Sequence, residues 1–424
     1  MKIIEGFESA KSVLSRQAPK EMFSGDEREQ AVRQIVNDVR DRGDVALFDY
    51  TEKFDAVRLA ALEVDKEQIK GACLKVDSEL LSALKLAAER ISSFHRAQKD
   101  NVWGGAKPGS GQLLRPLERV GVYVPGGRAS YPSTVLMTAI PAKVAGVKEV
   151  ILTTPPGKDG AVPPLTLAAA ALARVDRVFS VGGAQAVAAL AFGTESVPRV
   201  DKICGPGNIF VALAKKLVYG IVGIDGIQGP SEVLIIADET ADPEYCAADL
   251  LAQAEHDPLA SAILLTTSPN LADRVNQEVK EQVKSLKRQA IVAESLENGG
   301  LIGVVNSIDE AIELANLYAP EHLCLMVDKA ASYLDRISNA GCIVLGEKAT
   351  VVLGDYMVGP SHVLPTAGTA RFSSPLNVSD FIKLTSVVDV DKGSLQKLGR
   401  AAQTLATAEG LEAHARAIEK RLEN

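Results

Sequence analysis

The spacing of hydrophobic positions changes between the first quarter of the chain and its middle. In residues 26–43 and 77–98 the apolar side chains recur at helical spacing, and the first of these segments ends at Gly43. The second opens with Asp77 and Glu79, a capping residue and an acidic residue that favour the start of a helix. The N-terminal quarter is therefore predicted to be mainly helical.

From about residue 120 onward, short β-rich apolar runs alternate with alanine-rich helical segments. The runs are VGVYV, EVILTT, RVFSVG, EVLIIAD, SAILLTTS, LIGVVNS, HLCLMV and CIVLG. Such alternation is typical of parallel sheets with helices on both faces. The runs form two blocks, residues 120–230 and 231–350, joined at the Gly- and Pro-containing segment GIDGIQGPSE. This pattern predicts two similar α/β domains.

Helical spacing returns near the C-terminus, in residues 393–409 and 411–423, with a break at Gly410. This tail packs either on its own subunit or on a neighbouring one, and the pattern leaves both arrangements open.

The composition is that of a globular protein with a large core. The 424 residues are 46% hydrophobic and 24% charged, and the length suggests two or three domains. The net charge of −8, without a dense Lys/Arg run, argues against nucleic acid or a membrane surface as a partner. We find no signal peptide or membrane span, and five cysteines without a Cys-x-x-Cys pair indicate reduced thiols and a cytoplasmic protein.

The histidines are few enough to consider one by one. His95 is in register with the apolar face of its helix and is expected at a core boundary. His256 lies in LLAQAEHDP, where Gln253 and His256 share one helix face and could both reach a metal ion. The alternative is a histidine that closes the helix by bonding its last carbonyls.

A mixed ligand set is one candidate for a metal site. Gln253, His256, Asp355 and His414 would offer two imidazoles, a carboxylate and an amide oxygen, a set that suits Zn²⁺ or Mn²⁺. Asp355 lies in a Gly-bracketed loop, where it could equally be a turn residue.

Glu321 and His322 stand together at the start of a predicted strand. Histidine is the usual acid or base near neutral pH, and a glutamate can activate water. Neighbouring side chains of a strand point to opposite faces, so both serve one site only if the backbone turns there. A pair at a strand edge that faces solvent is the alternative.

Three Gly-rich turns follow strand-like runs and precede helices, where anionic cofactors meet helix N–H groups. They are YVPGGRASYPST, VGGAQAVAAL and CGPGNIFVA. None contains the G-x-G-x-x-G dinucleotide fingerprint or a Walker motif, so they are equally well explained as tight turns between strand and helix.

The chain resembles the histidinol dehydrogenase family along nearly its whole length. The segments that carry the resemblance are VGVYVPGG, STVLM, GGAQAVAALAFGTESVP, KICGPGN, GPSEVL, LLAQAEHDP, APEHL, GDY with GPSHVLPT, and AEGLEAH. The resemblance implies a zinc- and NAD-dependent enzyme that oxidises L-histidinol through histidinal to L-histidine, the last step of histidine biosynthesis.

The resemblance also implies a role for each site residue. Glu321 is expected to activate water and His322 to act as general base. The implied ligands and contacts are Gln253, His256, Asp355 and His414 for one zinc ion per subunit; Ser231, His362 and Glu409, together with the zinc ligands and His322, for the substrate; and Tyr123, Gln185 and Asn208 for NAD.

The architecture implied by the family is α/β, with two incomplete Rossmann-like parallel-sheet domains and helical N- and C-terminal extensions. The expected parts are an extension over 1–20, a first domain from 21–123 and 232–376, a second domain over 124–231, and a dimerisation segment over 377–424. The family forms homodimers in which this last segment crosses to the partner, so that the active site is shared between subunits.

Two other enzyme classes remain as alternatives. One is a relative on the same scaffold that oxidises another small alcohol, such as a sulfonated diol. The other is a zinc hydrolase that would use Glu321 and the metal without a cofactor.

Overall fold

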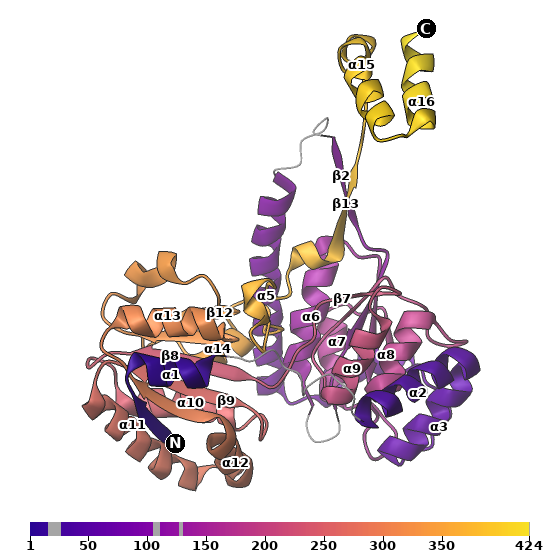
Figure 1. The fold of residues 1–424 in the computed structure, drawn as a ribbon. Coiled ribbons are helices and arrows are strands. Elements are labelled where there is room, and N and C mark those ends of the chain that lie inside the picture. The colour runs from indigo at the N-terminus through magenta and orange to yellow at the C-terminus, as the bar shows by residue number, and fades with distance from the viewer. Residues whose placement is uncertain (16–26, 105–110, 127–129, 424) are drawn as a thin grey trace. The chain divides into compact units, whose positions relative to one another are not determined.

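The computed structural model describes residues 1–15, 27–104, 111–126 and 130–423 of the chain. The protein divides into two units (Figure 1). Met1–Asp100 and Pro116–Ile382 form the first unit, and Asn101–Arg115 and Lys383–Asn424 form the second. The first unit contains the two parallel sheets that were expected.

The six-stranded sheet contains the second block of apolar runs. Its strands lie in the order β1-β10-β9-β8-β11-β12, and all neighbours are parallel. Their bounds are β1 Lys2–Glu5, β8 Glu232–Ala237, β9 Ser261–Thr266, β10 Gly300–Val304, β11 His322–Met326 and β12 Cys342–Leu345.

Helices cover both faces of this sheet. One face packs against α10 (Pro243–Ala254), α11 (Pro269–Gln282) and α12 (Gln289–Gly299), together with Val351 from α14 (Val351–Tyr356). The other face packs against α1 (Phe7–Leu14) and α13 (Ile308–Tyr318). Every residue of β8 is buried, as expected for a parallel strand that is covered on both sides.

The five-stranded sheet contains the first block of runs, in the parallel order β5-β4-β3-β6-β7. Its strands are β3 Arg119–Tyr123, β4 Glu149–Thr154, β5 Arg177–Ser180, β6 Lys202–Cys204 and β7 Gly223–Ile224. The helices around it are α2 Glu27–Arg42, α3 Asp44–Asp55, α4 Lys66–Gly71, α5 Ser78–Gly104, α6 Pro132–Ala145, α7 Pro164–Leu172, α8 Gly183–Phe192 and α9 Ile209–Val218.

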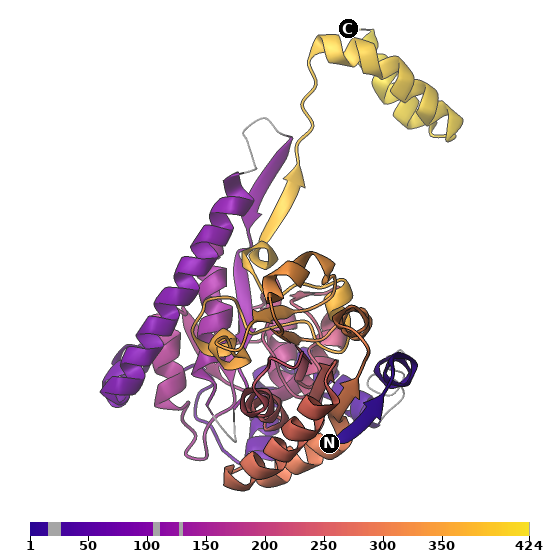
Figure 2. The ribbon, with the colours of Figure 1, turned by 90° about the vertical axis from the view of Figure 1, so that its left-hand side faces the viewer.

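Both sheets share one strand topology. Numbered along the chain within each block, the order is 3-2-1-4-5, which is the Rossmann order without a sixth strand. In the six-stranded sheet, β1 adds an edge strand beside β10 (Figure 2). The prediction of two incomplete Rossmann-like sheets with additional helices is confirmed.

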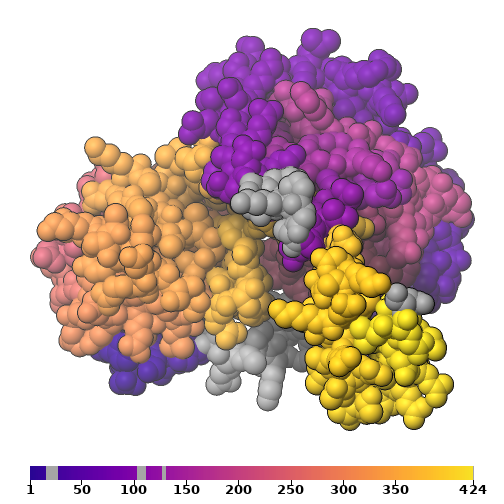
Figure 3. Space-filling model, turned by 90° about the horizontal axis from the view of Figure 1, so that it is seen from above, coloured from indigo at the N-terminus to yellow at the C-terminus, as the bar shows by residue number. Residues whose placement is uncertain are grey.

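The second unit contains a helical hairpin, α15 (Lys392–Ala408) and α16 (Glu412–Leu422), which pack against each other. These are the two helices that the spacing predicted, drawn in yellow in Figure 3. A two-stranded sheet pairs β13 (Ile382–Ser386) with β2 (Gln112–Pro116).

The structure differs from the expected division at the N-terminus. Residues 2–5 were expected in a helical extension but form an edge strand, and residues 16–20 of that extension lie outside the described residues. Helices α2 and α3 were grouped with residues 232–376. They pack instead on α8, because their buried apolar positions join the core of the five-stranded sheet. The expected domain boundaries stay a prediction.

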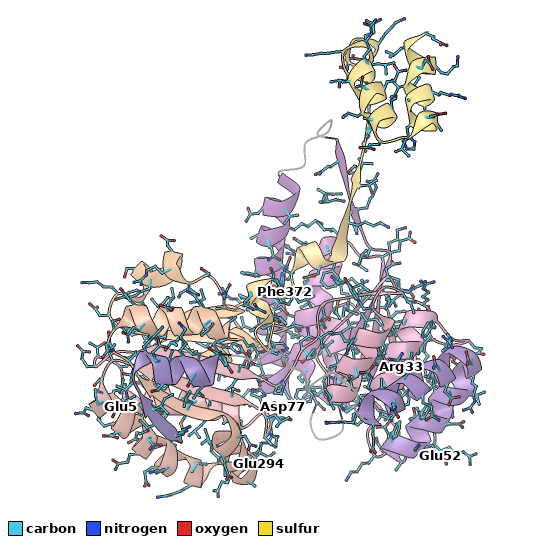
Figure 4. All side chains as sticks on the ribbon, viewed as in Figure 1. Glu5, Arg33, Glu52, Asp77, Glu294 and Phe372 are labelled. Atoms are coloured by element: carbon cyan, nitrogen blue, oxygen red, sulfur yellow. The ribbon has the colours of Figure 1, made fainter. Side chains whose placement is uncertain are left out.

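The outward positions of these two helices carry polar side chains, among them Arg33 on α2 and Glu52 on α3 (Figure 4). The prediction for His95 is wrong, because this side chain is 0% exposed rather than at a boundary. Its Nδ1 lies 3.0 Å from Oε1 of Gln98, and that oxygen also accepts a hydrogen bond from the Val378 amide, so the segment around Val378 covers the helix here.

Candidate active site

Part of the expected site lies at the amino edge of the six-stranded sheet, namely Ser231, Gln253, His256, Glu321, His322 and Asp355. Strands β8 and β11 are neighbours, with His322 in register with Val233, so Ser231 and Glu321 lie just outside the two strand starts. Helix α10 ends at this edge, because it returns the chain to the start of β9, and therefore brings Gln253 and His256 there.

Glu321 and His322 serve one site because the backbone turns before β11. Ala319 ends α13 with φ of 52°, and Pro320 follows it. The Glu321 carboxylate then lies 3.7 Å from Nδ1 of His322. A backbone turn at this point was the stated condition for Glu321 and His322 to serve one site.

The backbone of Glu232 orients both side chains. Its N–H donates to Oε2 of Glu321 at 2.8 Å, and its carbonyl oxygen lies 3.2 Å from Nδ1 of His322. Because a carbonyl can only accept, Nδ1 carries the proton. In the neutral ring the lone pair is then on Nε2, which lies 3.5 Å from Oδ1 of Asp355.

The surroundings raise the pKa of both His322 and Glu321 above their ordinary values. Burial acts to lower the pKa of His322, but the Glu321 carboxylate and the hydrogen bond to Asp355 outweigh it and raise the pKa to about 9. Burial raises the pKa of Glu321 to about 7, although the charge of His322 opposes the rise. The pKa values of both groups are therefore determined by residues at this one edge of the sheet.

Three of the four expected metal ligands lie in the first unit. Gln253 is 3% exposed, so its side-chain amide is buried at the end of α10. Desolvation lowers the pKa of His256, and the nearby Asp355 carboxylate opposes the lowering. Burial acts to raise the pKa of Asp355, but the hydrogen bond from His322 and the charges of His322, His362 and His256 lower it overall.

Across the described ranges, no three His, Cys, Asp or Glu side chains gather in a metal-holding arrangement. His256 and Asp355 supply two such side chains, and Gln253 belongs to a type outside that set. The remaining expected ligand, His414, lies in the first turn of α16 in the second unit, as an exposed side chain. Glu409 ends α15 in the same unit and is also exposed.

His362 links this edge to the five-stranded sheet. Its Nδ1 lies 2.9 Å from the carbonyl oxygen of Asp355, so Nδ1 carries the proton and Nε2 accepts from the Thr134 hydroxyl at 3.2 Å. Burial lowers the pKa of His362, so the ring is held neutral. Thr134 lies in the first turn of α6, which follows β3.

The expected NAD contacts lie at the carboxyl edge of the five-stranded sheet. Tyr123 ends β3, and its hydroxyl oxygen accepts from the Gly183 amide at 3.1 Å. Gln185 is buried in α8, and its Oε1 has no hydrogen-bond partner among the described residues. Asn208 caps α9 by accepting from the amides of Phe210 and Val211.

This edge includes the point between β3 and β6 where the strand order reverses, which is the usual ligand crevice of such sheets. Gly205 follows β6 with φ of 112°, and a Cβ there would overlap the Tyr123 carbonyl oxygen, so only glycine fits. The Gly-rich turn after β3 was also expected here, but its residues 127–129 lie outside the described residues.

Two residues of the site were not singled out from the sequence. Glu232 and Thr134 stand inside apolar segments, and a buried polar residue in such a segment was the available signal. Their partners lie 89 and 228 residues away in the chain, so the pairing itself could not be read from spacing.

Comparison with known proteins gives one family over the whole chain. The family model described as histidinol dehydrogenase matches residues 19–422. A histidinol dehydrogenase of Dehalococcoides mccartyi (strain CBDB1) is 59% identical over 436 aligned positions that cover 100% of both chains. One from Clostridium acetobutylicum is 53% identical and covers 92% of each.

A solved structure agrees with these sequence matches. The crystal structure of histidinol dehydrogenase from Elizabethkingia anophelis superimposes with a TM-score of 0.92 at 37% identity, and the match covers 100% of this chain and 98% of that one. The chain belongs to the histidinol dehydrogenase family.

Proposed function

We propose that the protein oxidises L-histidinol through histidinal to L-histidine, the last step of histidine biosynthesis, with NAD⁺ as oxidant and one zinc ion per subunit. The observation that carries this proposal is the pair Glu321 and His322 beside Gln253, His256 and Asp355 at one sheet edge. Family membership with relatives at 59% identity favours histidinol over a sulfonated diol.

The donor set fits a zinc ion. The amide of Gln253 is buried, and Asp355 interacts with the imidazole of His256. Gln253, His256, Asp355 and His414 would hold the ion, which matches the nitrogen and oxygen ligands that zinc accepts. When bound, zinc would polarise the substrate oxygen, and NAD⁺ would accept one hydride in each oxidation.

The residues of the chain would handle the protons. In the first oxidation, the neutral form of His322 takes the hydroxyl proton at Nε2 while the carbinol carbon loses a hydride, which leaves the aldehyde. In the second, a water loses a proton to Glu321 and its oxygen adds to the aldehyde carbon. Loss of a second hydride then leaves the carboxylic acid, which releases its remaining proton to solvent and becomes the carboxylate. Each oxidation converts one NAD⁺ to NADH, and the bond from Nδ1 of His322 to Glu232 keeps Nε2 available as the base.

Substrate and cofactor would be held by the remaining residues. Ser231, His362 and Glu409 would contact histidinol, and Tyr123, Gln185 and Asn208 would contact NAD. The unpaired Oε1 of Gln185 at the carboxyl edge of the five-stranded sheet supports the cofactor assignment.

We further propose a cytoplasmic homodimer whose active sites are shared between subunits. Leu398 and Leu405 of α15 are 59% and 64% exposed, and large exposed apolar side chains on one helix favour a covering partner. In such a dimer, Glu409 and His414 would complete the site of the neighbouring subunit. Within the described part of the chain, no helix has both the length and the apolar character needed to span a bilayer.

The test is an assay of NADH absorbance with metal analysis of the same sample. We expect NADH to accumulate with L-histidinol and NAD⁺, two NADH for each histidine formed, with about one zinc per subunit. Hydrolysis of an amide without NAD⁺ would favour the zinc hydrolase instead. A higher kcat/KM for a sulfonated diol than for histidinol would favour the other dehydrogenase.

A further inference from the structure

A buried hydrogen bond joins the helix that carries Gln253 to the helix that carries Asp355. The Thr350 hydroxyl donates to Oδ1 of Asp249 at 2.7 Å, across 101 residues of sequence. Asp249 lies on α10 and is 7% exposed. Thr350 is the residue that caps the start of α14.

The direction of this hydrogen bond follows from the chemistry of its two partners. An ionised carboxylate can only accept, so the single hydroxyl proton of Thr350 points to Asp249. The hydroxyl oxygen in turn accepts from the Val352 amide at 3.3 Å and so caps α14. One hydroxyl therefore ties the start of α14 to the middle of α10.

Both residues of this hydrogen bond lie within a few positions of an expected metal ligand in the chain. Asp249, Gln253 and His256 are spaced i, i+4 and i+7, so they follow one face of α10 and its C-terminal end. Helix α14 spans only Val351–Tyr356, with Asp355 in its last turn. A shift of its first residue would therefore move the Asp355 carboxylate.

A buried carboxylate is costly unless it is paired. Thr350 donates the one side-chain hydrogen bond that Asp249 receives from the described residues. Cys246 and Leu250 on α10 and Val351 on α14 belong to one apolar core. A charged group beside such a core is accounted for by the hydrogen bond that aligns the two ligand-bearing helices.

We propose that Asp249 and Thr350 are positioning residues that hold the zinc ligands of α10 and α14 in register. This inference rests on the zinc site proposed above. Neither residue is expected to touch the metal or the substrate. Their effect should therefore appear in metal affinity and metal geometry before it appears in cofactor binding.

The test compares Thr350→Val with Thr350→Ser in the full-length enzyme. Zinc affinity is measured by competition with a chromogenic chelator, and ligand geometry by the visible absorption of the Co²⁺-substituted protein. We expect Thr350→Val to bind zinc about 10 to 100-fold more weakly, the range found when a residue that orients a metal ligand is lost. Thr350→Ser should bind zinc with wild-type affinity because it keeps the hydroxyl.

The chain offers a matched control away from the metal. The Thr194 hydroxyl donates to Asp44 at 2.6 Å and accepts from the Val197 amide at 3.1 Å, so its hydrogen bonds copy those of Thr350. Thr194→Val should lower the melting temperature yet leave zinc affinity and the Co²⁺ spectrum unchanged.

Each outcome decides between the two proposals. Unchanged zinc affinity and Co²⁺ spectrum in Thr350→Val would overturn the positioning role, while a wild-type enzyme that holds no zinc would overturn the metal site itself. If Thr350→Val does not fold, Asp249→Asn decides. This variant keeps an acceptor but loses the charge, so we expect about threefold weaker zinc binding because charge-assisted bonds are the stronger ones. Wild-type affinity in Asp249→Asn would then reject the inference.

Discussion

The two sheets share one strand order but carry their candidate sites at opposite edges. In the five-stranded sheet, the expected NAD contacts lie at the carboxyl edge, where Rossmann-like sheets ordinarily bind ligands. In the six-stranded sheet, Glu321 and His322 lie at the amino edge, at the start of β11. Topology alone would have pointed to only one of these places.

The two edges also differ in the groups that they present, which are backbone groups at the carboxyl edge and side chains at the amino edge. At the carboxyl edge, glycine turns such as Gly205 bring backbone close to backbone, and helices α8 and α9 begin there. At the amino edge, the groups are side chains that burial and ionic neighbours have shifted in pKa. The first edge is suited to hold a cofactor, and the second to move protons.

The sharpest test of this division is the loss of the proposed base. His322→Asn should lower turnover by about 10²-fold or more, the size expected for a lost general base. Zinc content and NADH affinity, measured by atomic absorption and by fluorescence titration, should stay at wild-type values. Wild-type turnover in this variant would remove His322 from the proposed mechanism.

The second test concerns the ligand from the C-terminal hairpin. His414→Ala should weaken zinc binding by about 100-fold or more, since even residues that merely orient a ligand contribute 10 to 100-fold. The His95→Gln variant serves as control, because His95 lies outside the proposed site. Full zinc content in His414→Ala after dialysis against a chelator would refute the shared metal site.

The third test addresses the carboxyl edge alone. Gln185→Leu removes a buried polar group whose Oε1 lacks a partner among the described residues. We expect KM for NAD⁺ to rise about tenfold, equivalent to one lost hydrogen bond of roughly 1.4 kcal/mol. The zinc content and KM for histidinol should not change. An equal rise in KM for histidinol would show that the two edges do not serve the cofactor and the substrate separately.

Much of the fold was predictable because its central strands are continuous apolar runs. The predicted runs correspond to β3, β4, β5 and β8 to β12 within a few residues. Strands β6 and β7 were not predicted, because they have only three and two residues and so show no periodicity. Strand β1 was not predicted either, because it is a partly exposed edge strand whose position depends on pairing with β10.

The site was predictable where neighbouring residues carry the chemistry. Glu321 and His322 are adjacent in the chain, and Gln253 and His256 are three residues apart at the end of α10. The roles of Glu232, Thr134 and Thr350 depend instead on contacts between distant segments, which spacing cannot reveal. Local pattern identified the reacting groups, and only tertiary structure identified the residues that orient them.

The smallest expected effect is a change in the titration of His322 in the metal-free protein. Its pKa should lie near 9, above the ordinary value of 6.5, because Glu321 and Asp355 together outweigh burial. A raised folded pKa stabilises the folded state fully below about pH 6.5, and this stabilisation is lost as pH rises through about 9. Imidazole NMR signals of the zinc-free enzyme, followed from pH 6 to 10, report this pKa directly.

The Glu321→Gln variant sharpens that measurement. Removing this carboxylate takes away the strongest of the interactions that raise the pKa of His322, so the titration should move to lower pH. In Gln185→Leu the same signal should titrate as in the wild type, because that change lies at the other sheet's edge. A wild-type pKa at or below 6.5 would mean that burial prevails over the carboxylates. The amino edge would then lack the electrostatic character that distinguishes it from the carboxyl edge.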